Sequence, residues 1–296
     1  MKKGISLIDF ALIGVTFVWG LNFSVVKYSL NVLPPLGFNA LRYILAISFM
    51  WLMVARQGGI GSLKIEKKDW PAMVLLALLG HVAYQLLFII GIDFTKAANA
   101  SVMLGTIPVW IAINSQLFFE EKLTLAKASG ILLAFVGVIT IMAGSEEGLS
   151  LSSSTLKGDL IIILAAFCFG VFTLFSKKYL KKYKPLPLTA VLMSIGSFGI
   201  ILAGIPDLLR VDWSSVGYAA AGGVVYSGLL SIGAAYMIWN YGLKQVGAIK
   251  TSAYQNFVPV IGVALGVILL GETYTIIQYI GVAIAVTGIV ITRLSK

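Results

Sequence analysis

Residues 91–140 read GIDFTKAANASVMLGTIPVWIAINSQLFFEEKLTLAKASGILLAFVGVIT, and residues 242–291 read GLKQVGAIKTSAYQNFVPVIGVALGVILLGETYTIIQYIGVAIAVTGIVI. The second stretch follows the first at a constant offset of 151 residues without a gap, and ten of the fifty aligned pairs are identical. Apolar segments match one another by composition alone, so we rely on the other matches, which are Gly91/Gly242, Pro108/Pro259, Glu121/Glu272, Thr124/Thr275, Gly130/Gly281 and Gly137/Gly288. The chain therefore contains an internal duplication.

The duplication reaches the start of each half, where the offset becomes 150 residues. It pairs Asp9 with Asp159, Gly20 with Gly170 and Lys27 with Lys177. Between the halves, residues 144–155 are rich in serine and glycine, which is typical of a linker. We therefore expect a first repeat over residues 1–144, a linker outside the cytoplasm over 145–156 and a second repeat over 157–296.

The composition requires a lipid environment. The 296 residues are 59% hydrophobic and 11% charged, with a mean hydropathy of +0.96, whereas about 25% of residues are charged in soluble domains. Apolar runs reach about 20 residues, the length at which an α-helix crosses the hydrocarbon core, and the strands of membrane barrels are shorter and alternate in polarity. Because backbone groups in lipid need internal partners, we predict an all-α membrane protein.

Ten apolar segments are long enough to cross a membrane. They cover residues 8–29, 36–55, 70–92, 95–118, 124–143, 157–177, 187–206, 214–242, 247–270 and 274–292. Because each half contains an odd number of segments, the two halves must run through the membrane in opposite orientations. The sequence therefore predicts ten transmembrane helices in two inverted five-helix repeats around a central cavity.

The net charge of +10 raises the question of nucleic-acid binding, but the cations lie between apolar segments rather than in a basic domain. With the N-terminus in the cytoplasm, most lysines and arginines fall in cytoplasmic loops, and the opposite loops contain Lys96, Lys157 and Arg210. This asymmetry follows the positive-inside rule. We expect a multi-pass protein of the cell (inner) membrane with both termini cytoplasmic, in contact with the lipid bilayer and without a nucleic-acid partner.

The third apolar segment contains a stripe of polar and aromatic side chains. His81, Tyr84, Gln85 and Phe88 follow the i, i+3, i+4, i+7 spacing of one helix face. Polar groups inside membrane segments are costly and usually face a cavity or the interior of the bundle. The stripe predicts a cavity wall, and hydrogen bonding between helices is the alternative that the sequence leaves open.

Other segments contain similar groups. Together with His81, Tyr84 and Gln85, we predict as substrate-binding residues Trp19, Asn22, Arg42, Tyr236, Trp239, Asn240, Tyr254 and Gln255. Arg42 lies within the second segment, near its start. It either neutralises an anionic group of a substrate or pairs with helix C-terminal carbonyls as part of a gate, and both roles remain open.

Two matched pairs are candidates for a hinge or a gate. Pro108 and Pro259 remove a helical hydrogen bond at equivalent positions, so each marks either a hinge or a static kink. Glu121 and Glu272 end their segments before tight turns. We expect these glutamates to cap the next helix or to gate, rather than to contact substrate.

All acidic residues fall in loops or at segment ends, which disfavours a central carboxylate relay for protons. Proton coupling would therefore have to use His81 or a terminal acid, and it stays an open alternative. A lone histidine does not make a structural metal site. We expect neither a metal nor a cofactor.

Several short motifs occur together in a fixed order. They are Trp19-Gly20-Leu21-Asn22-Phe23 with Lys27, Pro34-Pro35 followed by Asn39-Ala40-Leu41-Arg42, Pro108 with Glu121, and Pro259 with Gly271-Glu272, Gln278 and Gly281. This pattern resembles the EamA family of the drug/metabolite transporter superfamily over essentially the whole chain. The resemblance implies two inverted five-helix repeats around a central cavity, and commonly the export of amino acids, related metabolites or aromatic compounds. Glu120 departs from the family, in which a glycine more often precedes the glutamate.

We therefore expect a secondary transporter, working as an exporter, for small metabolites such as amino acids or aromatic and amphipathic compounds. Alternating access between the inverted repeats would move the substrate, in a monomer or a homodimer. The alternatives are an intramembrane enzyme and a facilitative channel. An enzyme would need paired catalytic groups, and the chain has no His-Glu-x-x-His motif and no central pair of carboxylates. A channel would conduct without counterflow.

Overall fold

The computed structural model describes residues 6–58, 65–95, 97–118, 123–144, 153–258, 260–261 and 275–295, and these residues form helices and turns without any strand. The first half contains α1 (Leu7–Ser29), α2 (Pro35–Arg56), η2 (Lys67–Asp69), α3 (Trp70–Ala77), η3 (Leu78–Ala83), α4 (Tyr84–Phe94), α5 (Ala97–Leu104), α6 (Ile107–Phe118) and α7 (Leu125–Ala143). The second half contains α8 (Ser153–Leu180), α9 (Pro185–Leu208), η4 (Trp213–Ser215), α10 (Tyr218–Tyr226), η5 (Ser227–Ala234), α11 (Ala235–Val246), α12 (Ala248–Ser252), η6 (Ala253–Asn256) and α14 (Ile276–Leu294).

The predicted all-helical class is confirmed. Among the described residues, six continuous helices are long and apolar enough to cross a membrane, namely Leu7–Ser29, Pro35–Arg56, Lys67–Phe94, Leu156–Leu180, Pro185–Leu208 and Tyr218–Val246. Shorter apolar helices cover Val102–Phe118, Leu125–Ile141 and Ile276–Thr292. The described part of the chain therefore supports a multi-pass membrane protein.

Equivalent segments of the two halves adopt the same local structure. The fifth helices, α7 and α14, begin and end at the offset of 151 residues that the sequence shows. The third helix of each half contains a π-helical stretch, η3 in the first half and η5 in the second. A π-turn inserts an extra residue into a helix and is frequent at functional sites. The duplication therefore extends to this unusual local feature.

Two segment boundaries differ from those predicted. The eighth segment was predicted over 214–242, but the helix runs from Tyr218 to Val246 and stops at Gly247, whose φ of 89° few other residues adopt. The sixth segment was predicted over 157–177, but α8 begins at Ser153. Serine and threonine are favoured at the start of a helix, which explains why the helix begins within the polar run.

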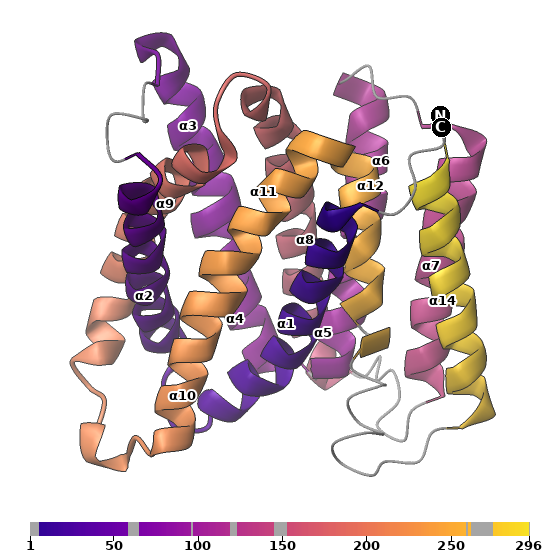
Figure 1. Cartoon of the computed structure of the whole chain (residues 1–296). Coiled ribbons are helices and arrows are strands. Elements are labelled where there is room, and N and C mark those ends of the chain that lie inside the picture. Colours follow the sequence, from indigo (N-terminus) through magenta and orange to yellow (C-terminus); the bar gives the residue numbers. More distant parts are fainter. Residues whose placement is uncertain are drawn as a thin grey trace.

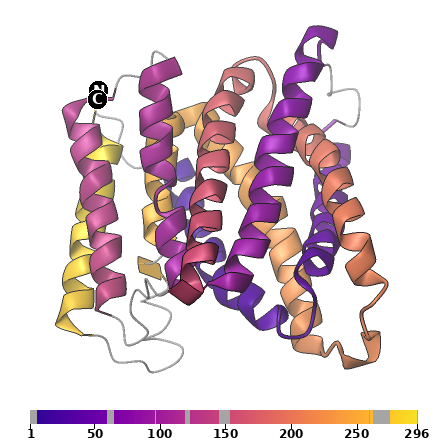
Figure 2. The ribbon, with the colours of Figure 1, turned by 180° about the vertical axis from the view of Figure 1, so that it is seen from behind.

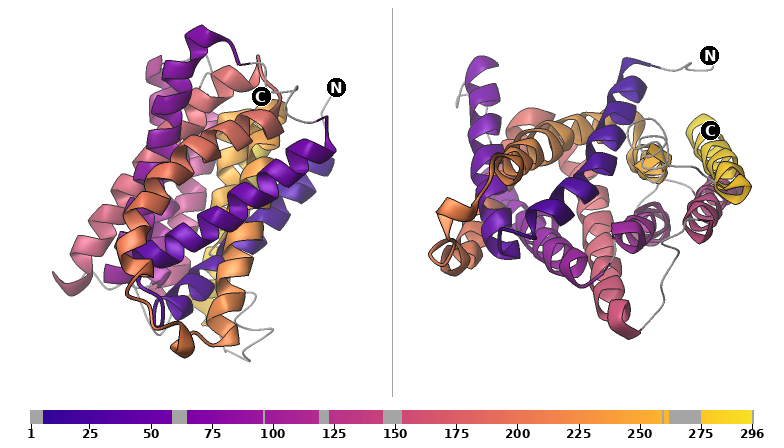
Figure 3. Two further views of the ribbon diagram at one scale, coloured as in Figure 1. Left: turned by 90° about the vertical axis from the view of Figure 1, so that its left-hand side faces the viewer. Right: turned by 90° about the horizontal axis from the view of Figure 1, so that it is seen from below.

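Helices of the first half pack against helices of the second. The principal pairs are α7 with α14, α2 with α9 and α4 with α8, and α1 also packs against α11. The beginning of α1 and the end of α14 lie at the same end of the bundle (Figure 1). Figure 2 shows α7 and α14 side by side at one edge of the molecule, and the end-on view in Figure 3 confirms that they stand beside the other helices. The interface between the halves therefore runs through the centre of the larger group of helices.

Glycines allow α7 and α14 to approach closely. A Cβ atom added to Gly137 would lie 2.3 Å from the backbone nitrogen of Ala285, and one added to Gly288 would lie 2.3 Å from that of Ala134. Such distances require backbone contact between the helices, because no flexible side chain lies between them. The matched glycines of the sequence therefore form one packing interface.

We expect Gly137→Ala to destabilise the protein by about 1–3 kcal/mol, because the new methyl group must push α14 away. The control is Gly14→Ala in α1, where an added Cβ meets nothing within 4 Å. That change should be neutral or stabilising, since alanine favours a helix over glycine. Heat denaturation in detergent measures both. Equal stability of the two variants would contradict the close contact.

Candidate functional site

A cavity lies at the interface between the halves. It is lined by side chains and backbone from α1, α2, α4, α5, η5, α11 and η6, and its volume is about 40 Å³. One water needs about 10–15 Å³ on the same scale, so this cavity has room for a few waters. Pockets that hold drug-sized molecules measure about 300–1,000 Å³. The cavity in this structure is therefore too small for a drug-sized molecule.

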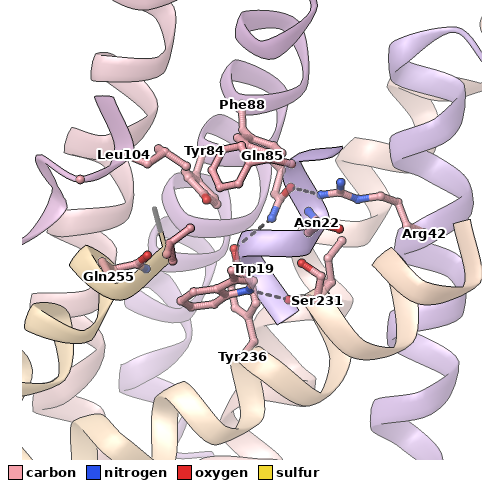
Figure 4. A pocket seen from close by; sticks show the side chains of 14 residues that line it. Trp19, Asn22, Arg42, Tyr84, Gln85, Phe88, Leu104, Ser231, Tyr236 and Gln255 are labelled. Carbon is pink, nitrogen blue, oxygen red and sulfur yellow. Dashed lines mark hydrogen bonds between the residues drawn. The ribbon is translucent and has the colours of Figure 1, made fainter. Parts of the chain in front are cut away.

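Seven of the eleven predicted substrate-binding residues line this cavity (Figure 4). They are Trp19, Asn22, Arg42, Tyr84, Gln85, Tyr236 and Gln255. These residues lie up to 236 positions apart in the sequence, and the packing of α1, α2, α4 and α11 brings them together. The remaining lining residues are Phe23, Phe88, Leu104, Gly105, Ser231, Ile232 and Val258. Phe88 belongs to the predicted stripe, whereas Ser231 and Ile232 belong to a π-helical stretch that no sequence pattern marks.

A chain of polar groups crosses the cavity wall from α2 to α11. The Arg42 Nη2 atom donates to Gln85 Oε1 at 2.6 Å, and Gln85 Nε2 lies 2.9 Å from the Tyr236 hydroxyl (Figure 4). Gln85 and Tyr236 differ by 151 positions, so they occupy equivalent places in the two repeats. The hydrogen bond between them therefore joins the two halves at corresponding points.

Two residues of α1 bond to the π-helical stretch η5. Trp19 donates from Nε1 to the carbonyl oxygen of Ser231 at 3.0 Å, and the Ser227 hydroxyl donates to Asn22 Oδ1 at 2.7 Å. A π-turn disturbs the regular i to i−4 ladder and leaves backbone groups free for other partners. These bonds hold the polar face of α1 against the second half of the chain.

Aromatic rings form the rest of the wall. Tyr84 stacks on Phe88 with centroids 6.1 Å apart and lies 4.7 Å from the ring of Phe169. Trp19 lies 6.4 Å from Tyr236 and meets it edge to face. Offset and edge-to-face geometries are the favourable ones for aromatic pairs. The cavity thus combines an aromatic surface with a small number of oriented polar groups, the composition typical of small-molecule sites.

Four predicted residues lie outside the cavity lining. His81 is fully buried, its Nδ1 lies 3.2 Å from the Tyr43 hydroxyl, and its ring packs on Phe172. Tyr84 and Gln85 follow η3, whereas His81 lies within it. The extra residue of the π-turn changes the helical register between His81 and these two residues. The His81 ring still lies 5.2 Å from that of Tyr236, which borders the cavity, and a role of His81 in substrate binding stays a prediction.

The other three make structural contacts. Trp239 is buried behind Trp19 at a ring distance of 5.2 Å. Asn240 donates from Nδ2 to the hydroxyl of Thr189 in α9 at 2.7 Å. The Tyr254 hydroxyl donates to Asp9 Oδ1 at 2.6 Å. A helix in the middle of a bundle has buried polar groups on several faces, and spacing alone does not tell which face borders the cavity.

Pro108 lies at the second residue of α6, because the fourth segment is broken between Leu104 and Ile107. Proline is tolerated in the first turn of a helix, where its missing N–H has no partner to lose. Pro108 cannot donate to the carbonyl of Leu104, four residues earlier, and the helix breaks directly after Leu104, at Gly105, which borders the cavity. Whether Pro108 acts as a hinge or as a static kink stays a prediction. Pro259, Glu121 and Glu272 lie outside the described residues. At the start of α14, the capping box is formed by Thr275 and Gln278.

Hydrogen bonds join the halves at both ends of the bundle. Asp9, in the first turn of α1, accepts from Tyr254 of η6. Asp159, near the start of α8, accepts from the Thr95 hydroxyl at 2.6 Å. Asp9 and Asp159 are equivalent in the repeat, and α1 and α8 begin at opposite ends of the bundle (Figure 1). Both bonds are formed in this structure, which agrees with the small volume of the cavity.

The described residues contain no group of three or more histidine, cysteine, aspartate or glutamate side chains placed to hold a metal ion. The sequence model of the EamA-like transporter family matches residues 6–143 of this chain and, a second time, residues 156–294. The chain belongs to the EamA-like transporter family. The resemblance noted in the sequence is thereby confirmed.

Relatives of this EamA-like transporter are found in bacteria and archaea. An uncharacterized transporter of Archaeoglobus fulgidus is 30% identical over 291 residues, covering 98% of each chain. The uncharacterized transporter YyaM of Bacillus subtilis is 26% identical, covering 94% of this chain and 90% of the relative. A solved crystal structure superposes with a TM-score of 0.78 at 19% identity, covering 96% of both chains, and shows the fold alone. The protein is thus a membrane transporter by family.

Proposed function

We propose that this protein is a secondary transporter for small metabolites such as amino acids or aromatic and amphipathic compounds, and that it exports them across the inner membrane. Its ten spans form two inverted repeats with both termini in the cytoplasm. The family membership, the opposite directions of α1 and α8 in Figure 1 and the matched π-helical stretches support this topology.

The cavity between the repeats is the observation that best supports this proposal. Its aromatic and amide groups come from both halves, and the Gln85–Tyr236 bond joins equivalent positions across the interface. In transporters built from inverted repeats, rocking of one repeat against the other opens a central site to alternate sides. Such a movement requires the contacts at one end to separate while those at the other end stay closed. The Asp9–Tyr254 and Asp159–Thr95 bonds are placed to act as these two gates.

Counterflow tests this function with defined probes. Proteoliposomes loaded with unlabelled phenylalanine, or in a second series with 3-phenylpropionate, receive the same labelled compound outside. A carrier accumulates label transiently above equilibrium and saturates with concentration. Uptake that rises linearly without an overshoot would indicate a channel and would contradict the proposal.

Tyr84→Ala should weaken transport of an aromatic probe about tenfold, mainly through a higher KM. The ring contacts Phe88 and Phe169 in the cavity wall, and one aromatic pair contributes about 0.5–1.5 kcal/mol. Tyr218→Ala is the matched control, since this tyrosine is 99% exposed at the start of α10. Counterflow at several probe concentrations measures both variants. An equal KM in the two variants would show that Tyr84 does not contact the substrate.

A further inference from the structure

Arg42 is a buried cation inside a predicted membrane span. Its side chain belongs to α2 and is 1% exposed. A charged group within the bilayer costs several kcal/mol unless it is paired or hydrated, and intramembrane charges are therefore usually functional. Arg42 also lines the central cavity. The positive charge of Arg42 at this position therefore requires a compensating partner.

The described residues compensate this charge only in part. One guanidinium nitrogen, Nη2, donates to Gln85, and the rings of Phe38 and Phe88 lie 5.5 and 5.9 Å from the guanidinium carbon. The Nε and Nη1 atoms have no hydrogen-bond partner among the described residues. No described carboxylate forms an ion pair with Arg42. Arg42, a residue of the cavity lining, therefore has unpaired N–H donors on a buried cation.

Lys27 shows how the same chain satisfies a cation that is structural. Its Nζ atom donates to the carbonyl oxygens of Ile92 at 2.8 Å and Thr95 at 2.9 Å, beside the C-terminal end of α4. Carbonyls at a helix C-terminus favour a cation. The pairing with helix carbonyls that was one alternative for Arg42 is thus made by Lys27, and the described partners of Arg42 include no carbonyl of a helix end.

We propose, on the basis of the proposed transport function, that Arg42 binds the carboxylate of an organic anion, and that among the metabolites named above the substrates are aromatic or amphipathic carboxylates without an ammonium group rather than amino acids. A guanidinium matches a carboxylate through two parallel charge-assisted hydrogen bonds. Gln85 holds one side of the guanidinium, and the rings of Tyr84 and Phe88 offer a surface to an apolar body. Among the described residues that line the cavity, no carboxylate is present to receive an ammonium group. The lining thus selects a net negative solute over a zwitterion or a cation.

A matched series of ligands tests the inference on the purified full-length protein. Thermal unfolding is followed with 3-phenylpropionate, its neutral amide 3-phenylpropionamide, the cation phenethylamine and the zwitterion phenylalanine. A ligand that binds the folded state raises the unfolding temperature. We expect 3-phenylpropionate to stabilise the protein with a Kd at least tenfold lower than that of any other member. Equal or stronger binding of the amide, the amine or phenylalanine would overturn the inference, as would a lack of binding by the carboxylate.

Substitutions locate the site. Arg42→Gln should weaken 3-phenylpropionate binding at least tenfold and leave the weak amide binding unchanged. Arg56→Gln is the control, because Arg56 is the exposed last residue of the same helix. Arg42→Lys keeps the charge but lacks the planar fork, so it should show an intermediate Kd. Unchanged carboxylate binding in either Arg42 variant would overturn the assignment, and the ligand series in the unmodified protein remains decisive if a variant does not fold.

The outcomes separate this inference from the proposed function. Saturable counterflow of phenylalanine, without selectivity for the carboxylate, would overturn the anion site and leave the carrier function standing. Selective binding of 3-phenylpropionate together with linear uptake that shows no overshoot would support the anion site and contradict the carrier function.

Discussion

Gln85→Glu is expected to abolish transport and to leave the protein folded. The substitution preserves the size of the side chain and places a carboxylate where the Gln85 carbonyl oxygen now lies, 2.6 Å from Arg42 Nη2. The new carboxylate would form an internal ion pair with Arg42 and neutralise the positive charge that the substrate's anionic group uses. Breaking a buried ion pair costs about 3–5 kcal/mol, so an anionic substrate would bind about a hundredfold more weakly or worse.

The Gln85→Glu experiment needs two measurements. Proteoliposome uptake of 3-phenylpropionate reports transport, and heat denaturation reports the fold. Gln245→Glu is the matched control, because Gln245 is exposed near the end of α11 and contributes nothing to the cavity lining. Uptake by Gln85→Glu within a few-fold of the Gln245→Glu rate would show that the charge of Arg42 is not used by the substrate.

A covalent link between positions 95 and 159, which would hold that end of the helix bundle closed, is expected to stop transport. The two side chains are 2.6 Å apart between Thr95 Oγ1 and Asp159 Oδ1, and they belong to different halves. Cysteines at both positions, in a Cys168→Ser background, can be joined by a short bifunctional thiol reagent cleavable with reductant. If this end must separate in every cycle, joining it should reduce counterflow at least tenfold, and reduction should restore it.

Two controls accompany the cross-link. Each single cysteine variant receives the same reagent, which separates cross-linking from modification. The cross-linked protein should still bind 3-phenylpropionate, because the opposite end remains free to open. Normal transport by the fully cross-linked protein would show that this end is not a gate.

The sequence predicted the large-scale features because they repeat. The offset of 151 residues relates the bounds of α7 and α14 to each other, and seven of the fourteen residues that line the cavity belong to the predicted set. Apolar length and helical periodicity depend on local sequence and can therefore be predicted. The family resemblance rests on the same spaced motifs and is confirmed by two matches along the chain.

The details that spacing does not predict occur where a helix departs from regular geometry. His81 lies within the π-helical stretch η3 and is absent from the cavity lining, and the fourth segment breaks completely between Leu104 and Ile107, in the turn before Pro108. Residue spacing does not indicate the π-helical stretch. Ser231 enters the site through its backbone carbonyl, which any residue type would supply. Contacts between distant segments, such as Asp9 with Tyr254, also depend on packing that periodicity does not describe.

The most direct test of alternating access measures the exposure of the cavity to each side of the membrane. Ser231 lines the cavity and is 4% exposed, so Ser231→Cys in a Cys168→Ser background reports opening through labelling by a membrane-impermeant thiol reagent. Tyr254→Phe removes the hydroxyl that bonds to Asp9 and so favours opening at that end. We expect Tyr254→Phe to make labelling of the cysteine at position 231 faster from the side at which α1 begins and slower from the other side. Labelling that changes in the same direction from both sides would contradict it.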